Sequence, residues 1–304
     1  MQGKLVPQDP NDPPASKLLK EIEAEKKRLV REGKIKESKQ LPPVSQEEIP
    51  YSLPKGWEWV RLAQIGVVNP RNDIDDDSMA TGFVPMASIQ DGYSGRHIFE
   101  QRKWMEIKKG FTHFADGDIG MAKITPCFEN AKSCVFIGLP NGLGAGTTEL
   151  HVFRNSFGSL VPDFLLYYLK NPAFISAAVL KMTGTAGQKR VPTAMFAENP
   201  FPLPPLKEQS RIIARIDELM AQCDALEKLR EERDAQRLAV HTAAVRRLLN
   251  VADTDGHIQA RGFLEQHFGE LYTVKENVTE CRHWTRLRIR KAWKSTVFSS
   301  GVKC

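Results

Sequence analysis

One short polar segment, MTGTAGQKRV at positions 182–191, carries the side chains best suited to contact a nucleic acid. Hydroxyl groups can bond phosphate oxygens, a glutamine amide can make a bidentate contact to adenine, and basic side chains can contact guanine or phosphate. Its glycines let a ligand approach the backbone closely. The alternative is an ordinary surface loop between a helix and a strand. The candidate DNA-binding residues here are Thr183, Thr185, Gln188, Lys189 and Arg190.

Two lysines and two tryptophans elsewhere could extend such a site. Lys123 and Lys132 stand on neighbouring strand-like segments and are further DNA-binding candidates, with a solvated surface as the alternative. Trp57 and Trp59 stand at the start of an expected strand. For this pair we favour packing in the core over stacking on bases.

Patterns that mark catalysis or metal binding are missing from the sequence. The glycine-rich run at 142–146 lacks the Lys-Ser/Thr of a phosphate-binding loop, and no GxSxG or HExxH occurs. The acidic run at 72–77 lacks the glycine and distal glutamate of a calcium loop, and the seven histidines lack ligand spacing. The segment ENPF at 198–201 resembles an amino-methyltransferase motif but lacks one proline and an upstream glycine motif. We expect no catalytic residue, no metal and no cofactor.

The segment 51–205 must position the candidate residues, and we expect it to fold as one α+β globular domain. Short apolar runs alternate with turn signals from Gly56 onward, which is typical of strands. After Pro162 the period changes and predicts two short helices, broken at Asn171 and Pro172.

A long helix is expected over 206–250, because neither proline nor glycine occurs between Pro205 and Gly256. If helical throughout, residues 206–249 would span roughly 66 Å at about 1.5 Å per residue. Apolar residues recur at alternating spacings of four and three, as in a coiled-coil seam: Ile212, Ile216, Leu219, Cys223 and Leu226. Arginines occupy the next two seam positions, so the seam shifts or breaks there.

Such a stripe needs a partner, because a long helix cannot bury it against itself. The partner could be the helix expected near 17–32, a second copy of the chain, or another protein. The alternative is a long surface helix packed on its own domain.

The remaining segments are an N-terminal region, 1–50, and two C-terminal regions, 251–280 and 281–304. The first contains a helix that Asp12 or Ser16 could start and that Gly33 would end, followed by a proline-rich linker. Residues 251–280 contain short helical patterns. Residues 281–304 form a basic tail without clean periodicity.

The charge of the chain is concentrated in that tail. The formal net charge is +6, yet residues 281–304 hold seven basic and no acidic residue, and residues 51–205 amount to only +1. The tail is either a basic arm for nucleic acid or, as we favour, a non-native extension produced by a lost reading frame. Five scattered cysteines, no apolar leader and no apolar stretch of about 18 residues predict a cytoplasmic protein without a membrane helix.

Several motifs together resemble the specificity subunit of type I restriction–modification systems. Their number, order and spacing carry the resemblance, which covers about residues 1–280. The motifs are GKLVPQDPNDPPASKLLKEIEAEKKRLVREGKIK at 3–36, LPKGWEWVRL at 53–62, GDIGMAKITP at 117–126, GAGTTELHVFR at 144–154, PDFLLYYL at 162–169, PFPLPPLKEQSRIIARIDELM at 200–220 and ADTDGHIQARGFLEQHFGELYTVKENV at 252–278.

The resemblance implies a non-catalytic subunit that binds double-stranded DNA. In that family two target-recognition domains, each reading half of a split site, alternate with two helical regions that pair as an antiparallel coil. The coil docks methyltransferase subunits, and through them the restriction subunit. This chain departs from the pattern, because it has one recognition domain, 51–205, and a rotated single repeat. We therefore also consider a homodimer through the coil.

Two other functions are considered beside this one. A coiled-coil assembly scaffold or inactive relic would associate with its partners without reading any DNA sequence. A methyltransferase or nuclease in its own right is disfavoured, because the sequence has no methyl-donor motif and no convincing carboxylate cluster for a metal.

Overall fold

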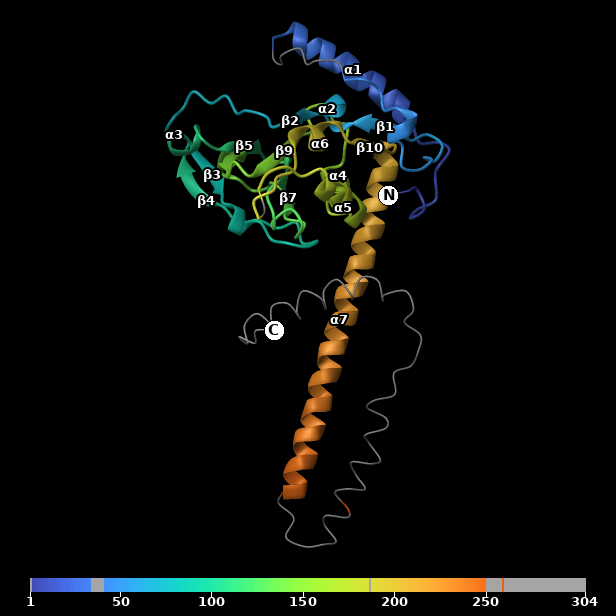
Figure 1. Cartoon of the computed structure of the whole chain (residues 1–304), viewed down its shortest axis with the longest axis vertical. Coiled ribbons are helices and arrows are strands. Elements are labelled where there is room, and N and C mark those ends of the chain that lie inside the picture. Colours follow the sequence, from blue (N-terminus) through green and yellow to red (C-terminus); the bar gives the residue numbers. More distant parts are fainter. Residues whose placement is uncertain (1, 34–40, 186, 250–258, 260–304) are drawn as a thin grey trace. The chain divides into compact units, whose positions relative to one another are not determined.

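A computed structural model of the 304-residue chain describes residues 2–33, 41–185, 187–249 and 259 (Figure 1). With the exception of residue 259, the expectations for 251–280 and 281–304 lie outside the described residues. The chain divides into two compact units, Met1–Ala221 and Gln222–Cys304. The first unit combines sheets with short helices, and a long helix begins within it, which confirms the predicted α+β class.

The N-terminal helix α1 spans Ala15–Arg31. It begins after Pro14, whose ring fixes an extended entry and supplies no side-chain cap, so a start capped by Asp12 or Ser16 was wrong. The predicted end is confirmed, because Gly33 adopts a φ of 69° and its N–H bonds to the carbonyl of Val30. Ala15 and Ile22 are the buried residues of this helix, and they join the main core.

The linker after α1 is attached to the domain by a buried arginine. Arg61 donates from Nε to the carbonyl of Pro42 at 2.9 Å and from a terminal nitrogen to the Glu48 carboxylate at 2.8 Å. Glu48 lies in a 3₁₀ turn, Gln46–Glu48, and this contact lowers its pKa to about 2. Residues 41–48 are therefore held against the first strand.

Within the described residues, ten short strands form three sheets. A two-stranded antiparallel sheet pairs β1 (Glu58–Arg61) with β10 (Pro200–Leu203). A four-stranded antiparallel sheet has the order β2-β9-β6-β7, with bounds Val67–Val68, Leu150–Arg154, Ile119–Ala122 and Ser133–Val135. The third sheet has the order β4-β3-β8-β5, with bounds Glu100–Lys103, Ala80–Val84, Leu143–Gly146 and Thr112–Ala115.

The glycine-rich run at 142–146 is largely strand β8, which pairs in parallel with β3. A Cβ atom added at Gly144 would lie 2.5 Å from the carbonyl oxygen of Gly82. The glycine therefore permits close packing of two strands, which explains a glycine-rich segment without any phosphate-binding role.

Helices α2 (Leu62–Ile65), α3 (Trp104–Ile107), α4 (Pro162–Leu169), α5 (Pro172–Leu180) and α6 (Thr193–Glu198) are short. Two further 3₁₀ turns span Met86–Ser88 and Pro140–Gly142. The predicted break between α4 and α5 is confirmed: Asn171 caps α5 by accepting a bond from the N–H of Ala173, and Pro172 occupies the first turn.

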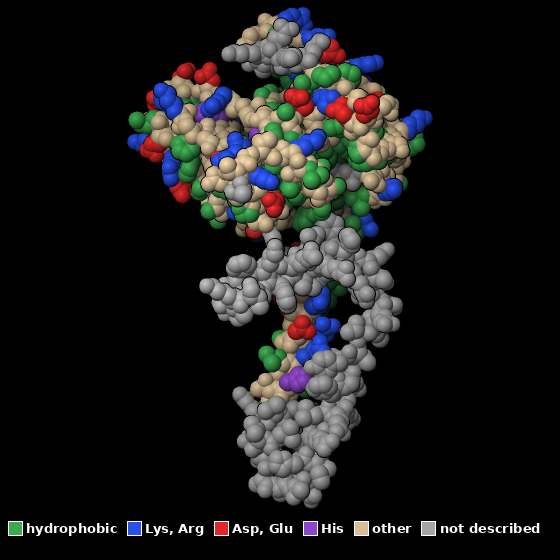
Figure 2. Space-filling model, viewed as in Figure 1, with side chains coloured by type: hydrophobic (Ala, Val, Ile, Leu, Met, Phe, Trp, Pro, Cys, Tyr) green, Lys and Arg blue, Asp and Glu red, His purple; other side chains and the backbone are tan. Residues whose placement is uncertain are grey.

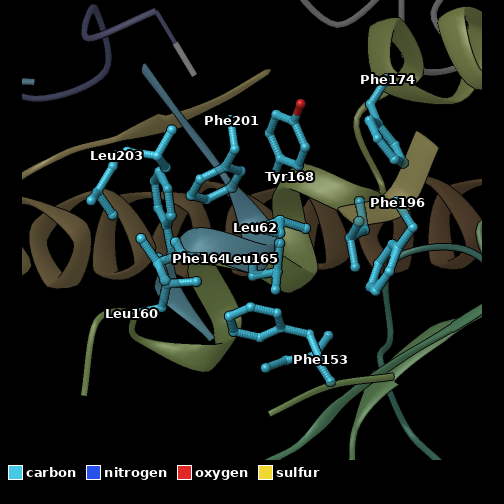
Figure 3. Packing of buried hydrophobic residues seen from close by; sticks show 14 of the residues in the cluster. Leu62, Phe153, Leu160, Phe164, Leu165, Tyr168, Phe174, Phe196, Phe201 and Leu203 are labelled. Atoms are coloured by element: carbon cyan, nitrogen blue, oxygen red, sulfur yellow. The ribbon is translucent and has the colours of Figure 1, made fainter. Parts of the chain in front are cut away.

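The main core lies where α4, α6, β9 and β10 meet (Figure 3). Phe164 and Phe201 are fully buried and meet edge to face, with ring centroids 5.9 Å apart. Burying a side chain of this size contributes about 1.5–3 kcal/mol, so this cluster is the principal stabilising element of the domain. Trp57 is a core residue, as predicted, but Trp59 is half-buried and packs edge to face against Tyr51 outside the core clusters.

Helix α7 spans Leu206–Leu249, the 44 residues expected. Its first turns are bound to the domain by buried groups. The Trp57 indole N–H donates to Glu208 at 2.9 Å, and Gln209 accepts from the N–H of Val161 at 2.8 Å. Arg211 forms an ion pair with Asp12 at 2.5 Å, and Ile212 is buried in the main core. Among the described residues, no helix is long and apolar enough to cross a membrane.

Trp57→Phe should lower the free energy of unfolding by about 1–3 kcal/mol, because it leaves the buried Glu208 carboxylate without its indole donor. Urea denaturation followed by circular dichroism measures this change. Trp59→Phe is the matched control, since the Trp59 indole nitrogen has no partner among the described residues. Equal destabilisation by the two variants would show that the hydrogen bond contributes nothing.

Candidate nucleic-acid interface

We call residues 182–191 the polar loop; its described residues, 182–185 and 187–191, follow helix α5 and pair across the loop. Thr183 and Arg190 bond to each other through both backbone groups, with N···O distances of 3.0 and 2.8 Å. Within the loop, the N–H of Gln188 donates to the carbonyl of Thr185 at 3.0 Å. Gly184 and Gly187 have positive φ values of 119° and 81°, which a residue with a Cβ atom adopts poorly. The sequence therefore specifies a closed loop.

The base of the polar loop is joined to residues 123–132, the connecting segment between β6 and β7. The N–H of Thr125 donates to the carbonyl of Lys189 at 3.0 Å, and the N–H of Val191 donates to the carbonyl of Lys123 at 2.8 Å. The structure thus brings Lys123 next to the polar loop, although the loop begins 59 positions later in the sequence.

Arg190 does not present a free guanidinium group. Its Nε and one terminal nitrogen each donate to a carboxylate oxygen of Glu149 at 2.9 Å. This bidentate contact lowers the pKa of Glu149, so the pair is ionised at neutral pH. Arg190 therefore serves to hold the loop, and a base contact from it would first have to break this pair.

His151, on β9, supports the other end of the polar loop. It is buried, it stacks on Phe196, and its Nε2 lies 2.8 Å from the carbonyl oxygen of Val191. Burial lowers its pKa to about 4, so the ring is neutral at neutral pH. Because a carbonyl only accepts, Nε2 carries the hydrogen, and Nδ1 is buried without a partner among the described residues.

The polar loop presents several exposed side chains that a ligand could contact. Thr183, Thr185, Gln188 and Lys189 are exposed. Among the described residues, no ion pair engages Lys189. Lys132 lies at the far end of the connecting segment, half-buried, and its Nζ donates to the carbonyl of Met86 at 3.3 Å.

Basic and acidic side chains are interspersed over the globular part on the face seen in Figure 2. This agrees with the net charge of only +1 for residues 51–205. Affinity for a polyanion must therefore come from a local group of side chains, because the domain as a whole has almost no excess of positive charge.

The other expected residues divide into buried and exposed groups. Along α7, Ile212 is buried and Ile216 and Leu219 are half-buried, whereas Cys223 is exposed and Leu226 is 51% exposed. The first seam position therefore belongs to the domain core. Within the described part of the chain, no group of three or more His, Cys, Asp or Glu side chains could hold a metal ion.

A family model described as type I restriction modification DNA specificity domain matches residues 54–233. The chain therefore belongs to this family of specificity subunits, as its motifs predicted, and such subunits are non-catalytic.

Two relatives from Escherichia coli are similar over 284 residues, or 91% of this chain. The chain is 48% identical to the type I restriction enzyme EcoAI specificity subunit and 46% identical to the EcoEI specificity subunit. It covers 47% of each relative, so it spans about half of their length.

Two solved structures share the fold, each with a TM-score of 0.52. One, at 25% identity, is an HsdS subunit from Thermoanaerobacter tengcongensis; the match covers 65% of this chain and 51% of that one. The other, at 24% identity, comes from work on complex assembly and conformational transition of the type I R-M system. That match covers 64% of this chain and 50% of the solved one.

Glu149→Ala should loosen the polar loop, because it removes the carboxylate that holds Arg190. A partly exposed pair contributes up to about 1 kcal/mol, so amide hydrogen exchange at Arg190 and Val191 should rise about two- to fivefold. In the unmodified chain the same protection should be lost only as the pH falls below 4.5, the ordinary pKa of the carboxyl group.

Glu129→Ala is the control for that measurement. Glu129 lies on the connecting segment, is exposed, and makes no ion pair among the described residues. If both variants exchanged alike at Arg190 and Val191, the role of Glu149 in holding the loop would be refuted.

Proposed function

We propose that this chain is the DNA sequence-recognition subunit of a type I restriction–modification complex, acting in the cytoplasm and reading one half of a split site. Residues 51–205 form its target-recognition domain. The observation that carries the proposal is the polar loop, whose backbone is fixed by hydrogen bonds and Glu149 while its hydroxyl, amide and ammonium groups are exposed. These are the groups that contact bases and phosphates in protein–DNA complexes.

The proposal of half-site reading is supported by the extent of the match. The chain spans about half the length of its curated relatives, and residues 51–205 would form one recognition domain. Two copies joined through 206–250 and the helix near 17–32 would read a two-fold-symmetric split site, since the symmetry of a dimer imposes symmetry on its DNA site.

The coiled-coil region has a separate role in this proposal. Helix α7 would dock methyltransferase subunits, and through them the restriction subunit, using a stripe that includes Cys223 and Leu226. Exposure of this apolar stripe supports a partner, because burial of such side chains drives helix association.

The proposal is tested by expressing the chain with its modification subunits and mapping methylated bases across a host genome. We expect one split motif whose two halves are related by two-fold symmetry, with protection of that motif from cleavage. Complex formation without a motif would support an assembly scaffold instead. Methylation by the purified chain alone would support an enzyme.

Variants of the polar loop extend the same experiment. Gln188→Ala should relax the motif at one base pair, because a lost base contact costs roughly 1–3 kcal/mol of discrimination at that position. Lys189→Ala should weaken all sequences alike if it contacts phosphate, and it should reduce the salt dependence of binding. Unchanged motifs and affinities in both variants would exclude this loop as the reader.

Leu226→Asp should weaken association through the helix, because it places a charge in the apolar stripe. Sedimentation of the chain, alone and with the modification subunit, should show at least a tenfold loss of association, or about 1.4 kcal/mol. Ala221→Asp introduces the same charge on the opposite helical face and should have no such effect. Equal loss in both variants, or none in either, would exclude the stripe as the contact surface.

A further inference from the structure

A second loop lies next to the connecting segment and bonds to it near Asn130, whereas the polar loop bonds to it at Lys123 and Thr125. This glycine loop, QDGYSGR at 90–96, is closed by a β-bridge between Ile89 and His97 and by a bond from the N–H of Gln90 to the carbonyl of Arg96 at 3.0 Å. The N–H of Gly92 donates to the carbonyl of Asn130, also at 3.0 Å. The connecting segment thus bonds to both loops.

A buried lysine fixes the glycine loop in place. Lys170, 1% exposed, donates from Nζ to the carbonyls of Gly92, Ala131 and Ser133 at 2.6, 3.0 and 2.9 Å. These bonds use all three hydrogens of the ammonium group and offset the cost of burying its charge. The lysine therefore fastens the glycine loop and the connecting segment to the end of helix α4.

The glycine loop is also packed directly on that helix. A Cβ atom at Gly95 would lie 2.9 Å from Leu166, and Gly95 has a φ of 62°. The Tyr93 hydroxyl donates to the carbonyl of Lys170 at 3.3 Å. The backbone of the glycine loop is thus held at several points. Less conformational entropy is therefore lost when a ligand binds to it.

The exposed side chains of this loop suit the reading of bases. Gln90 and Arg96 are exposed, and their side chains make no hydrogen bond or ion pair within the described part of the chain. Glutamine pairs bidentately with adenine and arginine with guanine in the major groove. Arg190 differs, because its guanidinium group is already bound to Glu149.

We propose that the glycine loop is a second base-reading loop of the recognition domain, with Arg96 and Gln90 as specificity-determining residues. This inference rests on the proposed function. The connecting segment holds the two loops on one support, so both address the same half-site. Arg96 takes the guanine-reading role that the polar loop's own Arg190 cannot fill without losing its ion pair.

The test uses the full chain with its modification subunits and maps methylated motifs for Arg96→Ala and Gln90→Ala. Each should relax the motif at one position, by roughly 5- to 150-fold in preference for the original base pair. Lys109→Ala and Gln101→Ala are the controls, because both side chains are exposed and lie outside the two loops, after α3 and on β4. They should leave the motif unchanged.

The outcomes separate this inference from the proposed function. A clear motif with the unmodified chain, unaltered by Arg96→Ala and by Gln90→Ala, would overturn the second loop and leave the proposed function standing. Uniformly weaker methylation with an intact motif would make Arg96 a phosphate contact and would also overturn the inference. The absence of any motif with the unmodified chain would overturn the proposed function itself.

Discussion

The backbone of the connecting segment is the support on which the proposed DNA-reading face depends. Its amides and carbonyls bond to the polar loop at Lys189 and Val191 and to the glycine loop at Gly92. Loops are ordinarily the mobile part of a fold, and mobility weakens discrimination between similar ligands. Here the backbone that carries the exposed side chains is hydrogen-bonded to the connecting segment in both loops, so the spacing of these side chains is set before any ligand binds.

Local sequence signals were sufficient for much of the fold. The absence of proline and glycine after Pro205 predicted all of α7, and Gly33 and Asn171 marked helix ends because only a few residue types suit those positions. The coiled-coil pattern along α7 gave the spacing of its apolar residues but not the surface against which each one packs. It could not tell that Ile212 joins the core of the domain, because tertiary packing and a coiled coil both select apolar residues there.

The site was only partly predictable for a physical reason. Loop composition identified the polar loop, but its supports lie far away in sequence: Glu149 is 41 residues from Arg190, and Lys170 is 78 residues from Gly92. Strand pairing brings them together, and a single sequence does not report that pairing. The short apolar run around His151 predicted a strand, without indicating that its imidazole supports a loop.

The pairing of β1 with β10 affects how the domain can be exchanged or duplicated during evolution. Glu58 lies opposite Leu203, so the first and last strands of the domain are neighbours, and the chain enters and leaves at one place. A segment whose two ends meet can be exchanged or duplicated as a unit, because its replacement leaves the flanking helices in register. The domain can therefore be replaced as one unit. Its two ends are joined by the four residue pairs between β1 and β10.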